Sequence, residues 1–196
     1  MKLIAITPAR NEDWIIGFSL RALLRWVDEA VVLAHCCTDR TADIVREIQR
    51  ETGRVTLIED SSPTWKEMEH RQRLLDQARA RKATHIATVD ADEVLSAHLL
   101  EFVRKQIDCL PPGCCMRLTM PQAWGSTTEY ATDALSEHGG HSVNWARAIA
   151  TVAFADAPKL GWKARPGDGY DHHHREPYNS RIGVSVAPDD GSGLIH

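Results

Sequence analysis

Residues 84–93 read Thr-His-Ile-Ala-Thr-Val-Asp-Ala-Asp-Glu, an apolar run that ends abruptly in acidic residues. The run from Ile86 to Val89 suits a central parallel strand, because both faces of such a strand are covered. In an open α/β sheet, ligands bind at the carboxyl ends of the strands. Asp90 and Asp92 follow there, and two carboxylates one residue apart can hold a hard divalent cation that bridges phosphate oxygens. The stretch therefore predicts a buried strand that leads into a metal site.

The same arrangement occurs four times in the first half of the chain. Apolar runs cover residues 3–6, 30–34, 55–58 and 86–89, and helical spacing follows each of the first three. Gly53 is expected to end the second helix and Pro63 to begin the third. Alternating strands and helices predict right-handed βαβ units and a parallel sheet. The polar residues that follow the four strands should therefore line one crevice: Arg10, Asn11, Asp39, Asp60, Asp90 and Asp92.

The second half of the chain has a weaker pattern. Residues 96–107 predict one more helix, and residues 114–120 and 148–154 predict two strands. A long polar stretch lies between these strands and contains Trp124, Tyr130 and Trp145. Loops of that length are usually functional or disordered.

Composition limits the classes of function. The chain has 196 residues, a net charge of −4 and an isoelectric point near 6.2, which gives no general attraction to nucleic acid or to anionic membranes. No apolar run approaches the ~20 residues that span a bilayer. The amino terminus enters a strand without a signal-peptide pattern, so a cytoplasmic protein is expected. The five cysteines show no Cys-x-x-Cys spacing, which argues against zinc and favours reduced thiols.

Three segments together resemble the family 2 glycosyltransferases of the GT-A fold. They are LIAITPARNE (residues 3–12), VVLAHCCTDRTADIV (31–45) and TVDADEVL (88–95). The resemblance implies a Rossmann-like, mostly parallel twisted sheet flanked by helices, in one domain. Residues 1–110 would form the nucleotide-sugar-binding half, ending in the Asp-x-Asp motif, and residues 111–196 the acceptor-binding half. One departure is that Ala34 and His35 replace the acid that commonly recognises the base.

The resemblance also implies the donor site. The family uses Mn²⁺ or Mg²⁺ to bind the diphosphate of a nucleotide sugar, with Asp92 as a direct ligand and Asp90 facing the ribose or acting through water. Arg71 occupies the position of an arginine that reaches the pyrophosphate. The donor would contact nine residues of the first half: Thr7, Arg10, Asn11, Glu12, Asp39, Asp60, Arg71, Asp90 and Ala91.

A further metal ligand is expected from a histidine late in the chain. In an extended segment, His172 and His174 would share one face, and Arg175 beside them would suit a phosphate. His196 is the other candidate, and it follows the first residues of an apolar run. Because natural domains seldom end there, the sequence predicts a truncated chain. The three histidines remain alternatives at this point.

The catalytic base is expected to be a carboxylate in the acceptor half that deprotonates the attacking hydroxyl. Asp133 is the first candidate and Glu129 the second, and Asp156 and Glu137 are further candidates. Trp124, Tyr130 or Trp145 would suit stacking on a sugar ring.

The sequence thus predicts a metal-dependent glycosyltransferase, inverting by resemblance, that acts on a hydroxyl of a glycan, lipid, protein or modified nucleic acid base. A nucleotidyltransferase is an alternative, although residues 7–11 lack the glycine-rich phosphate loop usual there. A non-catalytic nucleotide- or carbohydrate-binding module on the same fold is a second alternative. A hydrolase that uses the histidine triplet at residues 172–174 is the most distant.

Overall fold

The computed structural model describes residues 1–121, 123, 135–138, 141–144, 149–162, 175–188 and 192–196. Its first half alternates strands and helices, and its second half is mainly strands. The elements are β1 (Leu3–Ala9), α1 (Ile16–Leu23), β2 (Glu29–His35), α2 (Thr41–Thr52), β3 (Val55–Asp60), α3 (Glu67–Ala80), β4 (His85–Thr88), β5 (Val94–Leu95), the short 3₁₀ helix η1 (Ala97–Leu99), α4 (Leu100–Asp108), β6 (Cys114–Thr119), β7 (Leu135–His138), β8 (His141–Asn144), β9 (Ile149–Ala155), β10 (Arg181–Val186) and β11 (Leu194–Ile195).

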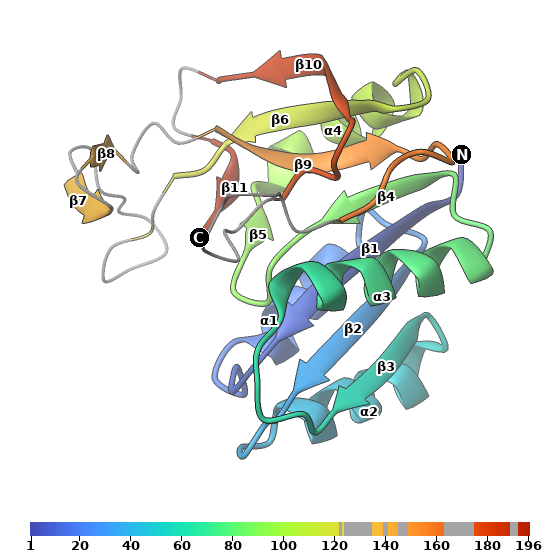
Figure 1. Ribbon diagram of the computed structural model, residues 1–196, viewed down its shortest axis with the longest axis vertical. Helices are drawn as coiled ribbons and strands as arrows, with labels where there is room; N and C mark the ends of the chain where they lie inside the picture. Colours follow the sequence, from blue (N-terminus) through green and yellow to red (C-terminus); the bar gives the residue numbers. More distant parts are fainter. Residues whose placement is uncertain (122, 124–134, 139–140, 145–148, 163–174, 189–191) are drawn as a thin grey trace.

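Seven strands form one twisted sheet in the order β10-β6-β9-β4-β1-β2-β3 (Figure 1). Strands β3, β2, β1 and β4 pair in parallel, as the four repeated runs predict. β9 runs antiparallel to both β4 and β6, and β10 is parallel to β6. The prediction of a mostly parallel α/β sheet is confirmed, and β6, β9 and β10 from the second half extend the sheet built by the first.

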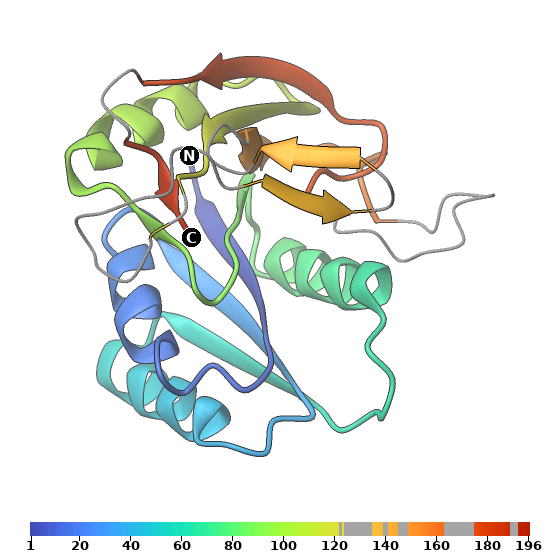
Figure 2. The same cartoon turned by 90° about the vertical axis from the view of Figure 1, so that its left-hand side faces the viewer.

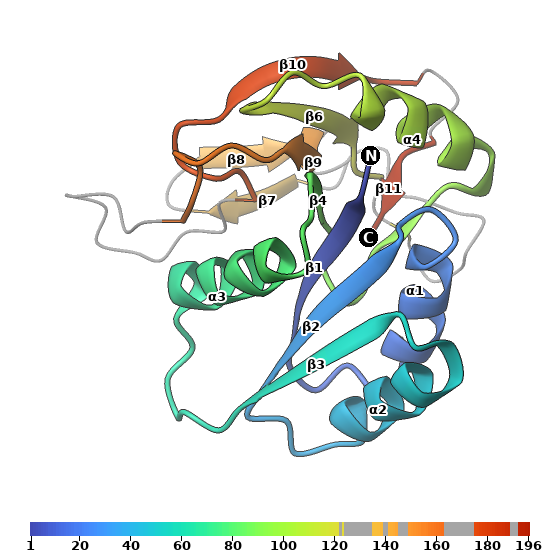
Figure 3. The ribbon, with the colours of Figure 1, turned by 90° about the vertical axis from the view of Figure 1, so that its right-hand side faces the viewer.

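Helices cover both faces of the sheet (Figure 3). α1, α2 and α4 lie on one face and α3 on the other. β1 shows why, because Leu3 and Ala5 belong to the core beneath α1 and α2, whereas Ile4 and Ile6 belong to the core beneath α3. All four side chains are fully buried, as expected for a central strand with two covered faces.

One helix boundary and one loop differ from the sequence-based expectation. Pro63 does not begin α3, which starts four residues later at Glu67, because the intervening loop folds Trp65 back against the end of β2. Gly53 does end α2, with a left-handed φ of 65°. The stretch predicted as a long loop contains the hairpin β7–β8, the two gold-orange arrows in Figure 2, which forms a two-stranded sheet of its own. Among the described residues, no helix is both long and apolar enough to cross a membrane.

Candidate functional site

The loops that follow β1 and β2 are joined to each other at the carboxyl edge of the sheet. Asn11 adopts a left-handed φ of 57°, and its Oδ1 accepts a hydrogen bond of 2.8 Å from the backbone N–H of Thr38. The N–H of Glu12 donates to Thr41 Oγ1 at 2.7 Å, and the N–H of Thr41 donates to Asp39 Oδ1 at 2.9 Å. Asn11 and Asp39, which are predicted to contact the donor, therefore also fix the conformation of the loops at this edge.

The loop after β4 carries the two aspartates into different surroundings. Asp90 receives hydrogen bonds from two arginines: Arg71 Nη2 lies 3.0 Å from Oδ1, and Arg175 Nη1 lies 3.3 Å from Oδ2. Arg71 is 1% exposed and also pairs with Glu67. In this structure Arg71 is therefore bound to the protein's own carboxylates, at the end of β4 rather than at an open surface.

Arg175 and Glu93 form a buried ion pair behind Asp90. The Glu93 side chain is fully buried, and Arg175 Nη2 donates to its Oε2 at 2.7 Å and to the carbonyl of Thr88 at 2.6 Å. Glu93 Oε2 also accepts the N–H of Asp90 at 2.7 Å, so the pair fixes the turn of the Asp-x-Asp motif. Burial opposes the charge of Arg175, but Asp90 and Glu93 together raise its pKa above the ordinary value.

Asp92 points away from this pair and meets the last residue of the sequence. His196 Nε2 lies 3.1 Å from Asp92 Oδ2, with 41% and 31% of the respective side chains exposed. The hydrogen bond to Asp92 raises the pKa of His196. Burial raises the pKa of Glu12, and repulsion from Asp92 raises it further, which places the end of the β1 loop at the same corner.

This corner fits a divalent cation. Asp92 offers an oxygen and His196 a nitrogen, and two neighbouring ligands of an octahedral ion lie about 3 Å apart, close to the distance found here. A carboxylate suits both Mg²⁺ and Mn²⁺. Both Asp90 oxygens accept bonds from arginine, which makes Asp90 the poorer direct ligand.

The strand pairing explains why His196 reaches Asp92. β11 lies antiparallel to β5, with Leu194 opposite Leu95 and Ile195 opposite Val94, so the next residue faces the end of the Asp-x-Asp motif. Ser96 holds the other end of this short ladder: its N–H donates to the carbonyl of Gly193 at 2.9 Å, and its Oγ accepts the N–H of Gly193 at 3.0 Å.

Replacing Gly193 with alanine is expected to lower the free energy of unfolding by about 1–3 kcal/mol, because the added methyl group overpacks a filled position. A Cβ at Gly193 would lie 2.3 Å from the carbonyl oxygen of Thr119 and 2.7 Å from Cδ of Pro121. Urea unfolding measures the change. Gly17→Ala in α1 is the matched control, since its nearest neighbours lie at ordinary contact distances of 3.4 Å and beyond. Equal stability of the two variants would contradict the prediction.

The remaining predicted residues lie at the same edge or outside the described residues. Thr7 is buried in β1, and its hydroxyl has no hydrogen-bond partner. Arg10 is exposed after β1, Ala91 is buried, and Asp60 ends β3. Asp156 follows antiparallel β9 and pairs with Arg79, so it lies at the opposite edge of the sheet and is wrong as a candidate base. Seven candidates lie outside the described residues: Trp124, Glu129, Tyr130, Asp133, Trp145, His172 and His174.

Sequence reasoning missed what Glu93 and Arg175 do. The sequence predicts that Arg175, beside the three histidines, suits a phosphate, whereas in the structure Arg175 binds Glu93 and fixes the Asp-x-Asp turn. The available signal was Glu93 itself, an acid next to the motif and only four residues beyond a buried run. Such an acid is rarely buried without a cationic partner.

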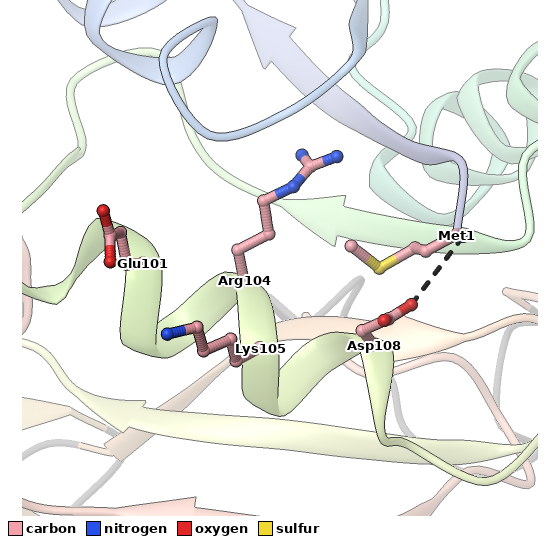
Figure 4. A pocket seen from close by; sticks show the side chains of 5 residues that line it. All are labelled: Met1, Glu101, Arg104, Lys105 and Asp108. Carbon is pink, nitrogen blue, oxygen red and sulfur yellow. Dashed lines mark ion pairs between the residues drawn. The ribbon is translucent and has the colours of Figure 1, made fainter.

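A pocket of about 350 Å³ lies elsewhere, between the amino terminus and α4. Figure 4 shows its lining side chains, with the Met1 ammonium 3.7 Å from Asp108. Arg104, on the same helix, donates to the carbonyl of Trp26, just before β2. The pocket therefore lies at the amino edge of the sheet and does not belong to the site described above.

The order and direction of the strands define the class of fold: the chain has a Rossmann-like α/β fold of the GT-A type. Solved structures similar to it include S. aureus TarS 1–349 in complex with UDP, at 23% identity over 66% of this chain and 38% of that chain, with a TM-score of 0.52. This chain thus spans well under half of the TarS chain. A 4-diphosphocytidyl-2C-methyl-D-erythritol synthase is 17% identical over 79% of this chain and 75% of its own, with a TM-score of 0.50.

A mannosyltransferase from Pyrobaculum calidifontis, in complex with GDP-Man and Mn²⁺, is 22% identical over 62% of this chain and 35% of its own, with a TM-score of 0.44. No protein-family model matches the chain, and a search of curated proteins finds no match.

Proposed function

We propose that this chain is a family 2-like glycosyltransferase that moves a sugar from a nucleotide-diphosphate sugar to an acceptor hydroxyl, with inversion, and that depends on a divalent metal ion. The observation that supports this most is the contact of 3.1 Å between Asp92 and His196 at the carboxyl end of a central parallel strand. That edge is where α/β sheets bind ligands. The GT-A fold, shared with a TarS structure that contains UDP, supports the same class of donor.

In this proposal, Asp92 and His196 would hold the metal ion, Mn²⁺ or Mg²⁺, which when bound would supply positive charge against the departing diphosphate. Asp90 faces the ribose, kept in place by Arg71 and Arg175. His172 and His174 remain alternative ligands. The donor is proposed to lie along the loops after β1, β2 and β3, against Thr7, Arg10, Asn11, Glu12, Asp39, Asp60 and Ala91.

Residues 1–110 are proposed as the nucleotide half and residues 111–196 as the acceptor half. Asp133, or else Glu129, is proposed as the base that removes the proton from the acceptor hydroxyl. Either residue would then lie across the donor from the leaving diphosphate. The nucleotidyltransferase alternative is weaker, because the turn at residues 7–11 contains no glycine with which to surround a triphosphate.

A binding panel tests this proposal. UDP-, GDP-, CDP- and TDP-sugars are each added with Mn²⁺, and one of the four is expected to raise the melting temperature. At a hundredfold excess over its dissociation constant, the ligand stabilises the folded state by about 2.7 kcal/mol. The same panel with EDTA is the control, and the stabilisation should fall there. The proposal is wrong if no nucleoside diphosphate binds and no nucleotide sugar is hydrolysed with Mn²⁺ or Mg²⁺ present.

A further inference from the structure

A second group of ligand-type side chains lies at the far end of the same edge. His35 is the last residue of β2, Asp60 is the last residue of β3, and the two are paired in the sheet register. His70 comes from the first turn of α3. Each of the three offers one ligand atom, and these atoms all lie within 4.8 Å of one another. Figure 3 shows the ends of β2 and β3 beside the loop that leads into α3.

We propose that His35, Asp60 and His70 form a binding site for a first-row transition-metal ion, Zn²⁺ in particular. Two imidazoles and one carboxylate are the ligand types that Zn²⁺ prefers, and three protein ligands leave a fourth position open. His70 Nε2 lies 3.5 Å from Asp60 Oδ2. Two ligands of a tetrahedral Zn²⁺ lie about 3.4 Å apart when the bonds are about 2.1 Å, so this pair already has the required spacing.

The two histidines are not explained as ordinary core residues. His35 and His70 are 0% and 2% exposed, and Nδ1 of each ring has no hydrogen-bond partner. His35 Nε2 reaches Ser62 Oγ only at 3.5 Å, the limit of a hydrogen bond. Burying polar nitrogens without partners is costly. A neutral imidazole that carries its proton on Nδ1 presents the lone pair of Nε2 to a metal ion, and Nε2 is the His70 nitrogen that lies near Asp60. Burial and the neighbouring His35 lower the pKa of His70, which keeps that ring neutral.

Trp65 closes the group against solvent. Its ring lies edge-on to both histidines, with centroids 5.1 Å from His35 and 4.7 Å from His70. The Trp65 Nε1–H donates to Glu67 at 2.8 Å, which fixes the ring at the start of α3. An apolar shell of this kind limits the access of solvent to the ligands beneath it.

Arg73 would compete with a metal ion for the carboxylate of Asp60. Its guanidinium contacts Asp60 Oδ2, and hydrogen bonds from Ser62, together with Arg73, hold the pKa of Asp60 well below its usual range. The carboxylate is therefore ionised and ready to bind a cation. Because 46% of the Arg73 side chain is exposed, it can turn into solvent when a metal ion binds.

The proposed site is separate from the Asp92 corner. β2 lies two strands away from β4, which corresponds to about 10 Å across the sheet. It shares Asp60 with the proposed donor contacts. It does not depend on the proposed glycosyl transfer, because binding of Zn²⁺ is measured without any nucleotide sugar. The absence of Cys-x-x-Cys spacing does not bear on it, since none of the three ligands is a cysteine.

The test is titration of the metal-free full chain with Zn²⁺, followed by calorimetry. A parallel titration with Co²⁺ is followed by visible absorption, because the absorption of Co²⁺ is intense only at low coordination number. His35→Gln and His70→Gln should each weaken one Zn²⁺ site at least ~100-fold, since losing even a residue that only hydrogen-bonds to a metal ligand costs about 10–100-fold. Arg73→Gln should increase the affinity for Zn²⁺ by up to ~5-fold, because it removes an exposed ion pair that competes for Asp60. A purely structural pair of histidines would show neither effect.

Three controls locate the bound ion. The exposed His98, changed to glutamine, should leave binding unchanged. Asp92→Asn and a variant with glutamine at residues 172–174 should retain the site that His70→Gln loses. Circular dichroism establishes that each variant is folded. Unchanged Zn²⁺ binding in folded His35→Gln and His70→Gln, or loss of the ion only with Asp92→Asn or the residue 172–174 variant, would overturn the proposal.

Discussion

Changing Asp92 to asparagine is expected to lower the turnover of the nucleotide sugar at least ~100-fold, the effect of removing a group that stabilises charge in the transition state. Asparagine keeps the shape of the side chain and removes the negative charge that is proposed to bind the metal ion. The fold should be unaffected, because 31% of the Asp92 side chain is exposed and it lies outside the buried pair of Glu93 and Arg175. Steady-state rates with saturating Mn²⁺ measure the effect.

Asp43→Asn is the matched control. It makes the same chemical change on α2, at a carboxylate that is 63% exposed and paired with Arg46. Full activity in Asp43→Asn with loss in Asp92→Asn supports catalysis at the Asp-x-Asp motif. If Asp92→Asn retains wild-type turnover, Asp92 is not a metal ligand. If neither protein turns over a nucleotide sugar and both bind it equally without metal, the chain is a binding module.

The strand ends could be predicted because the signal is local. Residues 3–6 are apolar without alternation, which indicates a strand covered on both faces, and the structure buries all four completely. Three further runs of this kind, separated by helical spacing, leave a parallel sheet as the simple solution. The shared edge of Asn11, Asp39 and Asp92 follows from topology alone and requires no long-range contact to be guessed.

The histidine beside Asp92 could not be chosen from the sequence. The three late histidines are chemically equivalent in the sequence, and the contact between His196 and Asp92 depends on the register between β11 and β5. That register is set by Ser96 and Gly193, which carry no pattern that marks them as partners. The group of His35, Asp60 and His70 was missed for the same reason, since its members come from three elements and meet only when the sheet forms.

The sequence also does not indicate which acid of the Asp-x-Asp region is buried. Asp90, Asp92 and Glu93 are alike in the sequence, yet Glu93 is fully buried and the two aspartates are partly exposed. Which acid turns inward depends on where Arg175 arrives, and Arg175 follows a segment that has no clear pattern. The resemblance to a known family identified the motif, but it did not indicate that its third acid serves the fold.

Changing Arg175 to methionine is expected to lower the free energy of unfolding by about 3–5 kcal/mol, because it leaves the buried Glu93 carboxylate without its partner. Arg175 is 11% exposed and Glu93 0%, so water cannot replace the lost guanidinium. The carbonyl of Thr88 loses a donor as well. Asp90 keeps Arg71, so the damage should be centred on Glu93. Urea unfolding followed by circular dichroism measures the loss.

The double variant Arg175→Met with Glu93→Gln separates a lost charge pair from lost packing. The double variant has no unpaired buried carboxylate, so it should be more stable than Arg175→Met alone. The interaction free energy between the two substitutions should be that of residues in contact, about 0.5–3 kcal/mol. Arg21→Met is the exposed control: its pair with Glu51 is about half exposed on both sides, and its loss should cost at most about 1 kcal/mol. An Arg175→Met protein as stable as Arg21→Met would show that the buried pair does not hold the Asp-x-Asp turn in place.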